Sequence, residues 1–167
     1  PDYSPPFDPI LSGVNIMRTH IAVHSLSLLI LPLRLALPAL DEDFYDETKF
    51  AIIPMGFCYP GKGKTGDLPP RSECAPEWHK QLFDLMPKIE LVILIGMYAQ
   101  KYYLKNKAKK TLTETVANYN DYLPTYFTLP HPSPRNRFWL TKNPWFEVEV
   151  IPELQKTIKK NESKKPY

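Results

Sequence analysis

Three prolines at alternate positions near the end of the chain restrict its backbone more than any other feature. Residues 129–136 read LPHPSPRN, with Pro130, Pro132 and Pro134 separated by single residues. Each proline fixes its own φ angle and moves the preceding residue out of helical geometry. The segment is therefore an extended turn that holds His131 in place.

The residues before this turn have the composition of a strand. Residues 125–129 (TYFTL) are aromatic and β-branched, so we expect His131 at the carboxyl end of a strand. Residues 50–54 and 91–95 are also predicted strands, and 91–95 is apolar throughout, as in parallel strands covered on both faces. We expect these three strands to be parallel neighbours, with ligands bound at their carboxyl edge.

Helical segments are predicted between and after these strands. Residues 74–86 have apolar side chains at helical spacing, and His79 on this helix is expected to face solvent. Residues 98–104 begin a second helix after Gly96, and Thr111 with Glu114 matches the capping box of a third. This alternation of strands and helices predicts an α/β domain.

The last predicted helix follows Asn143, which is its expected N-cap, with Pro144 at the first helical position. Pro152 is expected to bend this helix. The side chains expected to face inward are Trp145, Phe146, Val148 and Ile151.

Length and composition fit one globular domain of residues 1–167, 43% hydrophobic and 23% charged. Residues 1–15 are expected to form an irregular arm, 16–40 are atypical, and 160–167 form a polar tail. The apolar run 26–37 is broken by prolines and an arginine, so no membrane helix is expected. With two cysteines and no secretory signal, the expected compartment is the reducing cytoplasm.

Three motifs resemble the uracil-DNA glycosylase superfamily. HPSPRN resembles its second active-site motif, closest to the single-strand-selective monofunctional branch. Residues 90–103 resemble its apolar strand ending in glycine and the helix that follows, and residues 50–71 resemble the strand and loop that form one wall of the base pocket. The resemblance covers residues 41–160 and implies a three-layer α/β/α sandwich around a four-stranded parallel sheet.

The resemblance implies DNA with uracil or a related damaged base as the partner, single- or double-stranded, and a monomer without cofactor. His131 would donate to the base oxygen as the glycosidic bond breaks. Arg135 would fill the gap left by the flipped base, and Ser133 would contact phosphate. The other implied DNA-binding residues are Asn136, Lys62 and Lys64, and the implied base-pocket residues are Pro54, Met55, Gly56 and Phe57.

The chain departs from the family at its first motif, a glycine-rich loop with a carboxylate or amide that positions the attacking water. Between Val14 and Leu40 there is no glycine, aspartate or glutamate, and Asn15 is the one amide. One interpretation is a divergent buried strand and helix in which His20 and His24 are ordinary, partly buried histidines. The other is that residues 28–36 (LLILPLRLA) are a frame-shifted reading of the family's segment.

The missing motif leaves two functions open: excision of the base, or nucleic-acid binding without cleavage. As written, the chain is expected to be slow or inactive on uracil-containing single-stranded DNA, because orientation of the attacking water supplies much of such a barrier. The pocket wall also lacks the asparagine that reads uracil in several branches, since Pro54 or Met55 stands in its place. Base recognition would then depend on backbone groups of residues 55–57.

The spacing of residues disfavours two other kinds of site, a phosphate-binding loop and a metal or iron–sulfur site. Residues 56–67 (GFCYPGKGKTGD) do not match a phosphate-binding loop, and the prolines of residues 67–71 forbid the helix that such a loop needs. Cys58 and Cys74 resemble two of the four cysteines of the family's iron–sulfur branch, but a cluster needs four. Together with His79 they lack the paired spacing of a zinc site, so no metal is expected.

Overall fold

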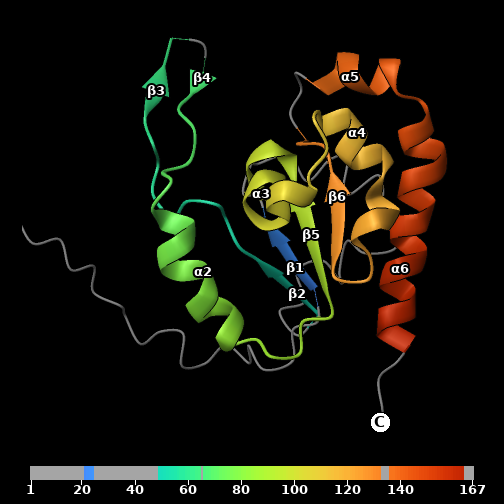
Figure 1. The fold of residues 1–167 in the computed structure, drawn as a ribbon, viewed down its shortest axis with the longest axis horizontal. Coiled ribbons are helices and arrows are strands. Elements are labelled where there is room, and N and C mark those ends of the chain that lie inside the picture. Colours follow the sequence, from blue (N-terminus) through green and yellow to red (C-terminus); the bar gives the residue numbers. More distant parts are fainter. Residues whose placement is uncertain (1–20, 25–48, 65, 133–135, 164–167) are drawn as a thin grey trace, which may run out of the picture.

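The computed structural model describes residues 21–24, 49–64, 66–132 and 136–163. Its main sheet has four parallel strands in the order β2-β1-β5-β6 (Figure 1). The strands are β1 (Ile21–His24), β2 (Phe50–Ile52), β5 (Leu91–Ile95) and β6 (Tyr126–Leu129). With helices beside these parallel strands, the predicted α/β class is confirmed.

The strand order corrects one prediction. β1 pairs with both β2 and β5, so residues 50–54 are not next to residues 91–95 as expected. The sequence did not locate β1 because it lies in the atypical segment 16–40, where strand and helix have similar apolar patterns. The pairing β5–β6 is as predicted, with Ile95 opposite Leu129.

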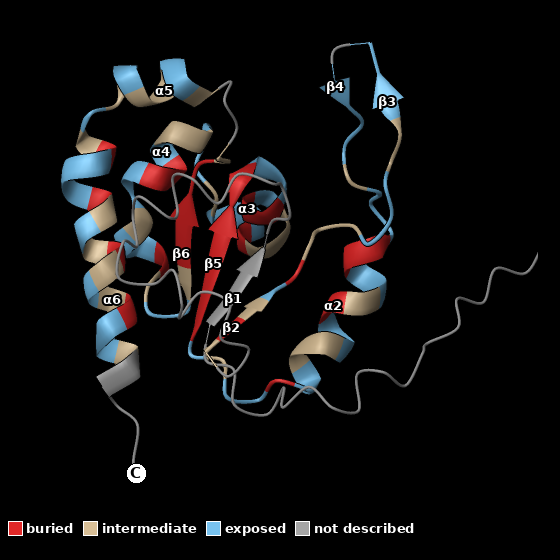
Figure 2. Cartoon of the chain, turned by 180° about the vertical axis from the view of Figure 1, so that it is seen from behind, coloured by how far each residue is buried: buried red, intermediate tan, exposed pale blue. Residues whose placement is uncertain are grey.

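Helices pack on both faces of the pair β5–β6. Leu91, Ile93 and Ile95 belong to a core cluster that also includes residues of α4 (Leu112–Ala117) and α6 (Ile151–Ser163). Val92 and Leu94 belong to a second cluster with residues of α3 (Gly96–Leu104) and, at its margin, α2 (Cys74–Asp84). β5 is therefore buried along its whole length (Figure 2), which explains why its sequence is a continuous apolar run.

The three helices predicted between strands are confirmed, with small changes at their ends. α2 begins at Cys74, and α3 begins at Gly96 directly after β5. The capping box of α4 is complete: Thr111 Oγ1 accepts from the Glu114 N–H, and the Glu114 carboxylate accepts from the Thr111 N–H.

The C-terminal helical region differs from the prediction. Asn143 follows the end of α5 (Arg137–Lys142), and the next helix starts as the π-helix η7 (Phe146–Val150) and continues as α6 through Ser163. Because Pro152 has no N–H and its ring would clash with the carbonyl of Val148 in an α-helix, the wider π turn accommodates it. Val148 consequently faces outward and is 72% exposed, so its inward prediction is wrong.

Residues 56–71 form a projection rather than a phosphate-binding loop. β3 (Lys62–Gly63) and β4 (Gly66–Asp67) pair antiparallel, and Tyr59 Oη donates to the Asp67 carboxylate at 3.1 Å. Figure 1 shows this hairpin and α5 at the end of the molecule toward which the main strands point. In the described part of the chain, no helix is long and apolar enough to cross a membrane.

Candidate active site

His131 lies two residues after β6, at the carboxyl edge of the sheet, as the sequence predicted. β6 ends at Leu129, and the buried Pro130 leads into the partly buried His131 and Pro132. The neighbouring strand β5 ends level with β6 and is followed directly by Gly96, the first residue of α3. His131 and Gly96 therefore face each other across the ends of two adjacent strands.

The contact between Gly96 and His131 leaves little room for a side chain at position 96. Gly96 has a φ of +82°, in the left-handed region that favours glycine. A Cβ atom on Gly96 would lie 3.2 Å from the Cβ and 3.4 Å from the Cδ2 of His131. The backbone of Gly96 thus supports the base of the imidazole.

Two amide side chains hold the backbone on either side of His131. The Nε2 of Gln100, a buried residue of α3, donates to the carbonyl oxygen of Leu129 at 2.8 Å and to that of Leu94 at 3.4 Å. The Nδ2 of Asn136 donates to the carbonyl oxygen of His131 itself. The Gln100 contacts join the ends of β5 and β6, and the Asn136 contact links the backbone of His131 to the residue before α5.

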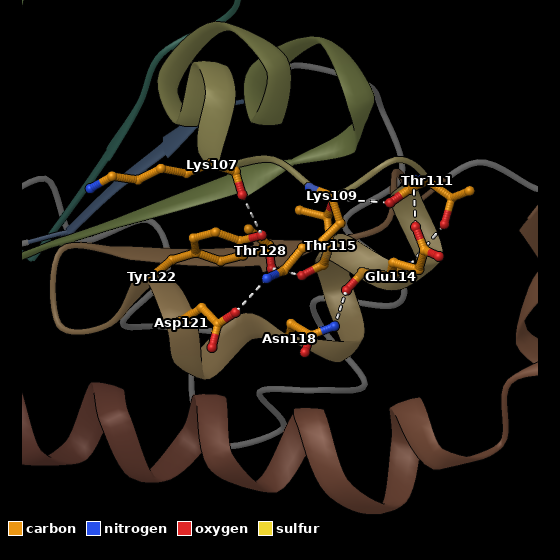
Figure 3. A network of polar contacts seen from close by, with 9 residues as sticks. All are labelled: Lys107, Lys109, Thr111, Glu114, Thr115, Asn118, Asp121, Tyr122 and Thr128. Atoms are coloured by element: carbon orange, nitrogen blue, oxygen red, sulfur yellow. Dashed lines mark hydrogen bonds and ion pairs between the residues drawn. The ribbon is translucent and has the colours of Figure 1, made fainter.

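A polar network supports β6 from the side of α4 (Figure 3). The hydroxyl of Thr128, fully buried in β6, donates to the Thr115 carbonyl at 3.1 Å. The Thr115 hydroxyl accepts from the Lys109 N–H at 3.1 Å and donates to the Thr111 carbonyl at 2.9 Å. The strand that ends at His131 is therefore fixed to the capped end of α4.

Burial lowers the pKa of His131 below its ordinary value of 6.5. The imidazole is consequently neutral at pH 7, where it still carries one N–H donor. A neutral donor at a sheet edge can hydrogen-bond an oxygen on which negative charge develops, without first requiring a proton from solvent.

The predicted base-pocket residues follow β2 at the same edge of the sheet. Pro54, Met55 and Gly56 are partly buried, and Met55 packs against the core cluster beside α2 and α3. Phe57 is 49% exposed. β2 and β6 are the outer strands of the sheet, three strand spacings or about 14 Å apart.

His79 is placed differently from the prediction. It is 2% exposed rather than solvent-facing, because α2 turns it toward α3 and the loop after β2. Its Nε2 is 3.0 Å from the Pro54 carbonyl oxygen and its Nδ1 is 2.5 Å from the Tyr103 hydroxyl. The amphipathic pattern of a helix does not show whether a histidine has hydrogen-bond partners on other elements. The sequence therefore did not reveal this contact.

The remaining predicted DNA-binding residues belong to the β3–β4 hairpin and to the segment 133–136. Lys62 and Lys64 are exposed on the β3–β4 hairpin. Ser133 and Arg135 lie outside the described residues, as do His20, Asn15 and the loop 41–46. His24 ends β1 between β2 and β5, at the carboxyl edge of the sheet.

The two cysteines have different surroundings. Cys58 is exposed, Cys74 is buried, and both are free. Among the residues that the structure describes, no three His, Cys, Asp or Glu side chains are grouped so as to hold a metal ion.

Comparison with known families agrees with this geometry. The sequence model of the uracil DNA glycosylase superfamily matches residues 7–155, which include the main sheet, the loop after β2 and the turn at His131. The match covers most of the 167 residues. The chain therefore belongs to the uracil DNA glycosylase superfamily.

Proposed function

We propose that the protein is a DNA glycosylase that flips uracil or a related damaged base out of DNA and hydrolyses its N-glycosidic bond slowly. The observation that carries this proposal is His131, a neutral, partly buried donor held by Gly96 and Asn136 at the sheet edge. Membership of the superfamily supports the substrate class. We further propose the superfamily's three-layer sandwich, closest to the single-strand-selective branch, for the whole domain.

In this reaction a water oxygen bonds to the sugar carbon while the bond from that carbon to the base nitrogen breaks. The electron pair leaves with the base and gives its oxygen negative charge; the water loses one proton to solvent, and the base takes up one proton, so the charges balance. A hydrogen bond from His131 to that oxygen lowers the barrier by about 3 kcal/mol, typical of one preorganised donor. The base would lie between His131 and residues 54–57, over the ends of β1 and β5.

We assign DNA contacts to the hairpin and to the segment after His131, on either side of the proposed base site. Lys62 and Lys64 on the exposed hairpin would meet phosphates, and Ser133 and Asn136 would hold the strand near the flipped nucleotide. Arg135 would fill the space that the base leaves. We expect Arg135→Ala to weaken binding to abasic DNA about tenfold with little change in stability, and equal affinities at one salt concentration would exclude this role.

A second function, nucleic-acid binding without cleavage, is favoured by a specific observation. Residues 15–40 contain no carboxylate and Asn15 is their one amide, so a group to orient water is missing from the segment that corresponds to the first motif. Slow turnover follows from the same observation, because the leaving base is still stabilised when water is poorly oriented.

The test of function is incubation of excess protein with single-stranded DNA that contains one uracil, followed by separate measurement of free uracil, abasic DNA and bound DNA. Matched release of uracil and abasic sites, above a protein-free control, supports hydrolysis. Tight binding without release over days supports the second function. Equal binding of DNA with and without uracil, with neither DNA altered, would contradict both the base specificity and the excision.

A further inference from the structure

The imidazole of His79 connects three elements beneath the loop that follows β2. It extends from α2, its Nε2 meets the carbonyl oxygen of Pro54, and its Nδ1 meets the hydroxyl of Tyr103 on α3. The ring stacks on Tyr103 with centroids 5.9 Å apart and an interplanar angle of 15°. These contacts fix both the position and the plane of the ring.

The chemistry of the partners assigns the hydrogens. A carbonyl oxygen accepts and never donates, so Nε2 must carry the hydrogen that points to Pro54. In the neutral ring Nδ1 then has a lone pair and accepts from the Tyr103 hydroxyl. Burial favours this neutral form, because it lowers the pKa of His79 and raises that of Tyr103.

His79 also contacts the far end of the same loop. The Phe57 ring lies nearly perpendicular to the imidazole, with centroids 6.0 Å apart and an interplanar angle of 89°. One buried side chain thus touches both Pro54 and Phe57, the first and last residues of the segment 54–57. Since Pro54 has no N–H, the backbone donors of this segment belong to residues 55–57.

We infer that His79 is a positioning residue for the segment 54–57, with Tyr103 orienting its imidazole so that backbone groups of residues 55–57 face a bound base. The inference rests on the proposed function where it names this segment as the wall of a base pocket. The contacts of His79 with Pro54, Phe57 and Tyr103 are independent of that function.

A pair of variants separates positioning from simple loss of packing. Glutamine places its amide nitrogen near the position of the histidine Nε2, so His79→Gln keeps a donor for the Pro54 carbonyl. Asparagine is one methylene shorter, so His79→Asn carries the same amide without the reach. Tyr103→Phe removes the orienting hydroxyl alone, and Tyr102→Phe is its control, because the Tyr102 ring also contacts the His79 ring, at an interplanar angle of 77°.

The first measurement uses no ligand. In ¹⁵N spectra of the full chain, His79 should have the Nε2–H tautomer, and the amide signals of Met55, Gly56 and Phe57 should keep their positions in His79→Gln and Tyr102→Phe. They should move, with faster hydrogen exchange, in His79→Asn and Tyr103→Phe. Unmoved signals in both of the latter variants would overturn the inference, and Tyr103→Phe decides it if His79→Asn does not fold.

The second measurement titrates free uracil into the same samples. We expect the affinity to fall about tenfold in His79→Asn, equivalent to about 1.4 kcal/mol, and to stay within about threefold of the parent in His79→Gln. Equal affinity in all variants would overturn the role in base binding. A parent that does not bind uracil would contradict the proposed function, while the amide signals would still decide whether His79 positions the segment.

Discussion

Gly96→Ala tests whether the close contact at the end of β5 positions His131. The new methyl group would meet the Cβ of His131 at 3.2 Å, and the backbone would have to keep a φ of +82°. An ordinary residue in the left-handed region costs about 1–2 kcal/mol, and for a chain of this size each kcal/mol corresponds to about 2–4 °C in Tm. We therefore expect a fall in Tm of about 2–8 °C.

Gly96→Ala should slow turnover as well as lower stability. His131 cannot turn away freely, because Pro130 and Pro132 flank it, so relief of the contact moves the imidazole by a few tenths of an ångström. A misplacement of about 1 Å can cost about a hundredfold in rate. We expect about a tenfold slower single-turnover release of uracil from single-stranded DNA.

Gly61→Ala is the matched control. Gly61 also has a positive φ, +99°, but a Cβ there would lie 3.6 Å from Leu68 on the hairpin, an ordinary contact away from His131. The control should lose similar stability and keep the parent's release rate at saturating protein. Equal release rates in Gly96→Ala and Gly61→Ala would refute the reasoning.

Two further predictions concern stability. Gln100→Leu leaves the Leu129 carbonyl without its 2.8 Å donor, so urea unfolding should show a loss of about 1–3 kcal/mol, and a loss under about 0.5 kcal/mol would contradict the role of this bond. Burial lowers the pKa of His79 below 6.5, so the unfolded chain binds a proton at a higher pH than the folded chain. The free energy of unfolding should therefore fall as the pH drops through 6.5, and it should level off below the folded pKa. His131 acts in the same direction, and His79→Gln should make the fall between pH 7.5 and 5.5 shallower, whereas an unchanged fall would argue against a buried neutral His79.

Local signals in the sequence predicted the parts of the fold that depend on neighbouring residues. The apolar run of β5, the capping box at Thr111 and the position of His131 just after β6 are each encoded within a few positions. β1 was not located, because its place between β2 and β5 depends on pairing with residues that are distant in sequence. The π turn before Pro152 was missed because the inward-facing residues were predicted with α-helical spacing throughout.

The sequence predicted which edge of the sheet would carry the candidate site, but not the contacts that build it. His131 and residues 54–57 were identified from their motifs, whereas the side chains that hold these two segments were not identified. Gln100, Tyr103 and His79 resemble ordinary helical residues in sequence, and their roles arise from carbonyl and hydroxyl partners on other elements. Long-range hydrogen bonds of this kind leave no periodic signal in the chain.

The central claim is that His131 stabilises the leaving base, and its most direct test compares single-turnover uracil release by the parent and by His131→Ala over long incubations with excess protein. We predict slow release by the parent and about a hundredfold slower release by the variant, as expected for removal of one preorganised donor, with unchanged binding to DNA. Rapid release by the parent would instead show that a group such as Asn15 or an acidic side chain of residues 41–46 orients the water. Equal rates of release by the parent and by His131→Ala would contradict the role of His131 and with it the proposed mechanism.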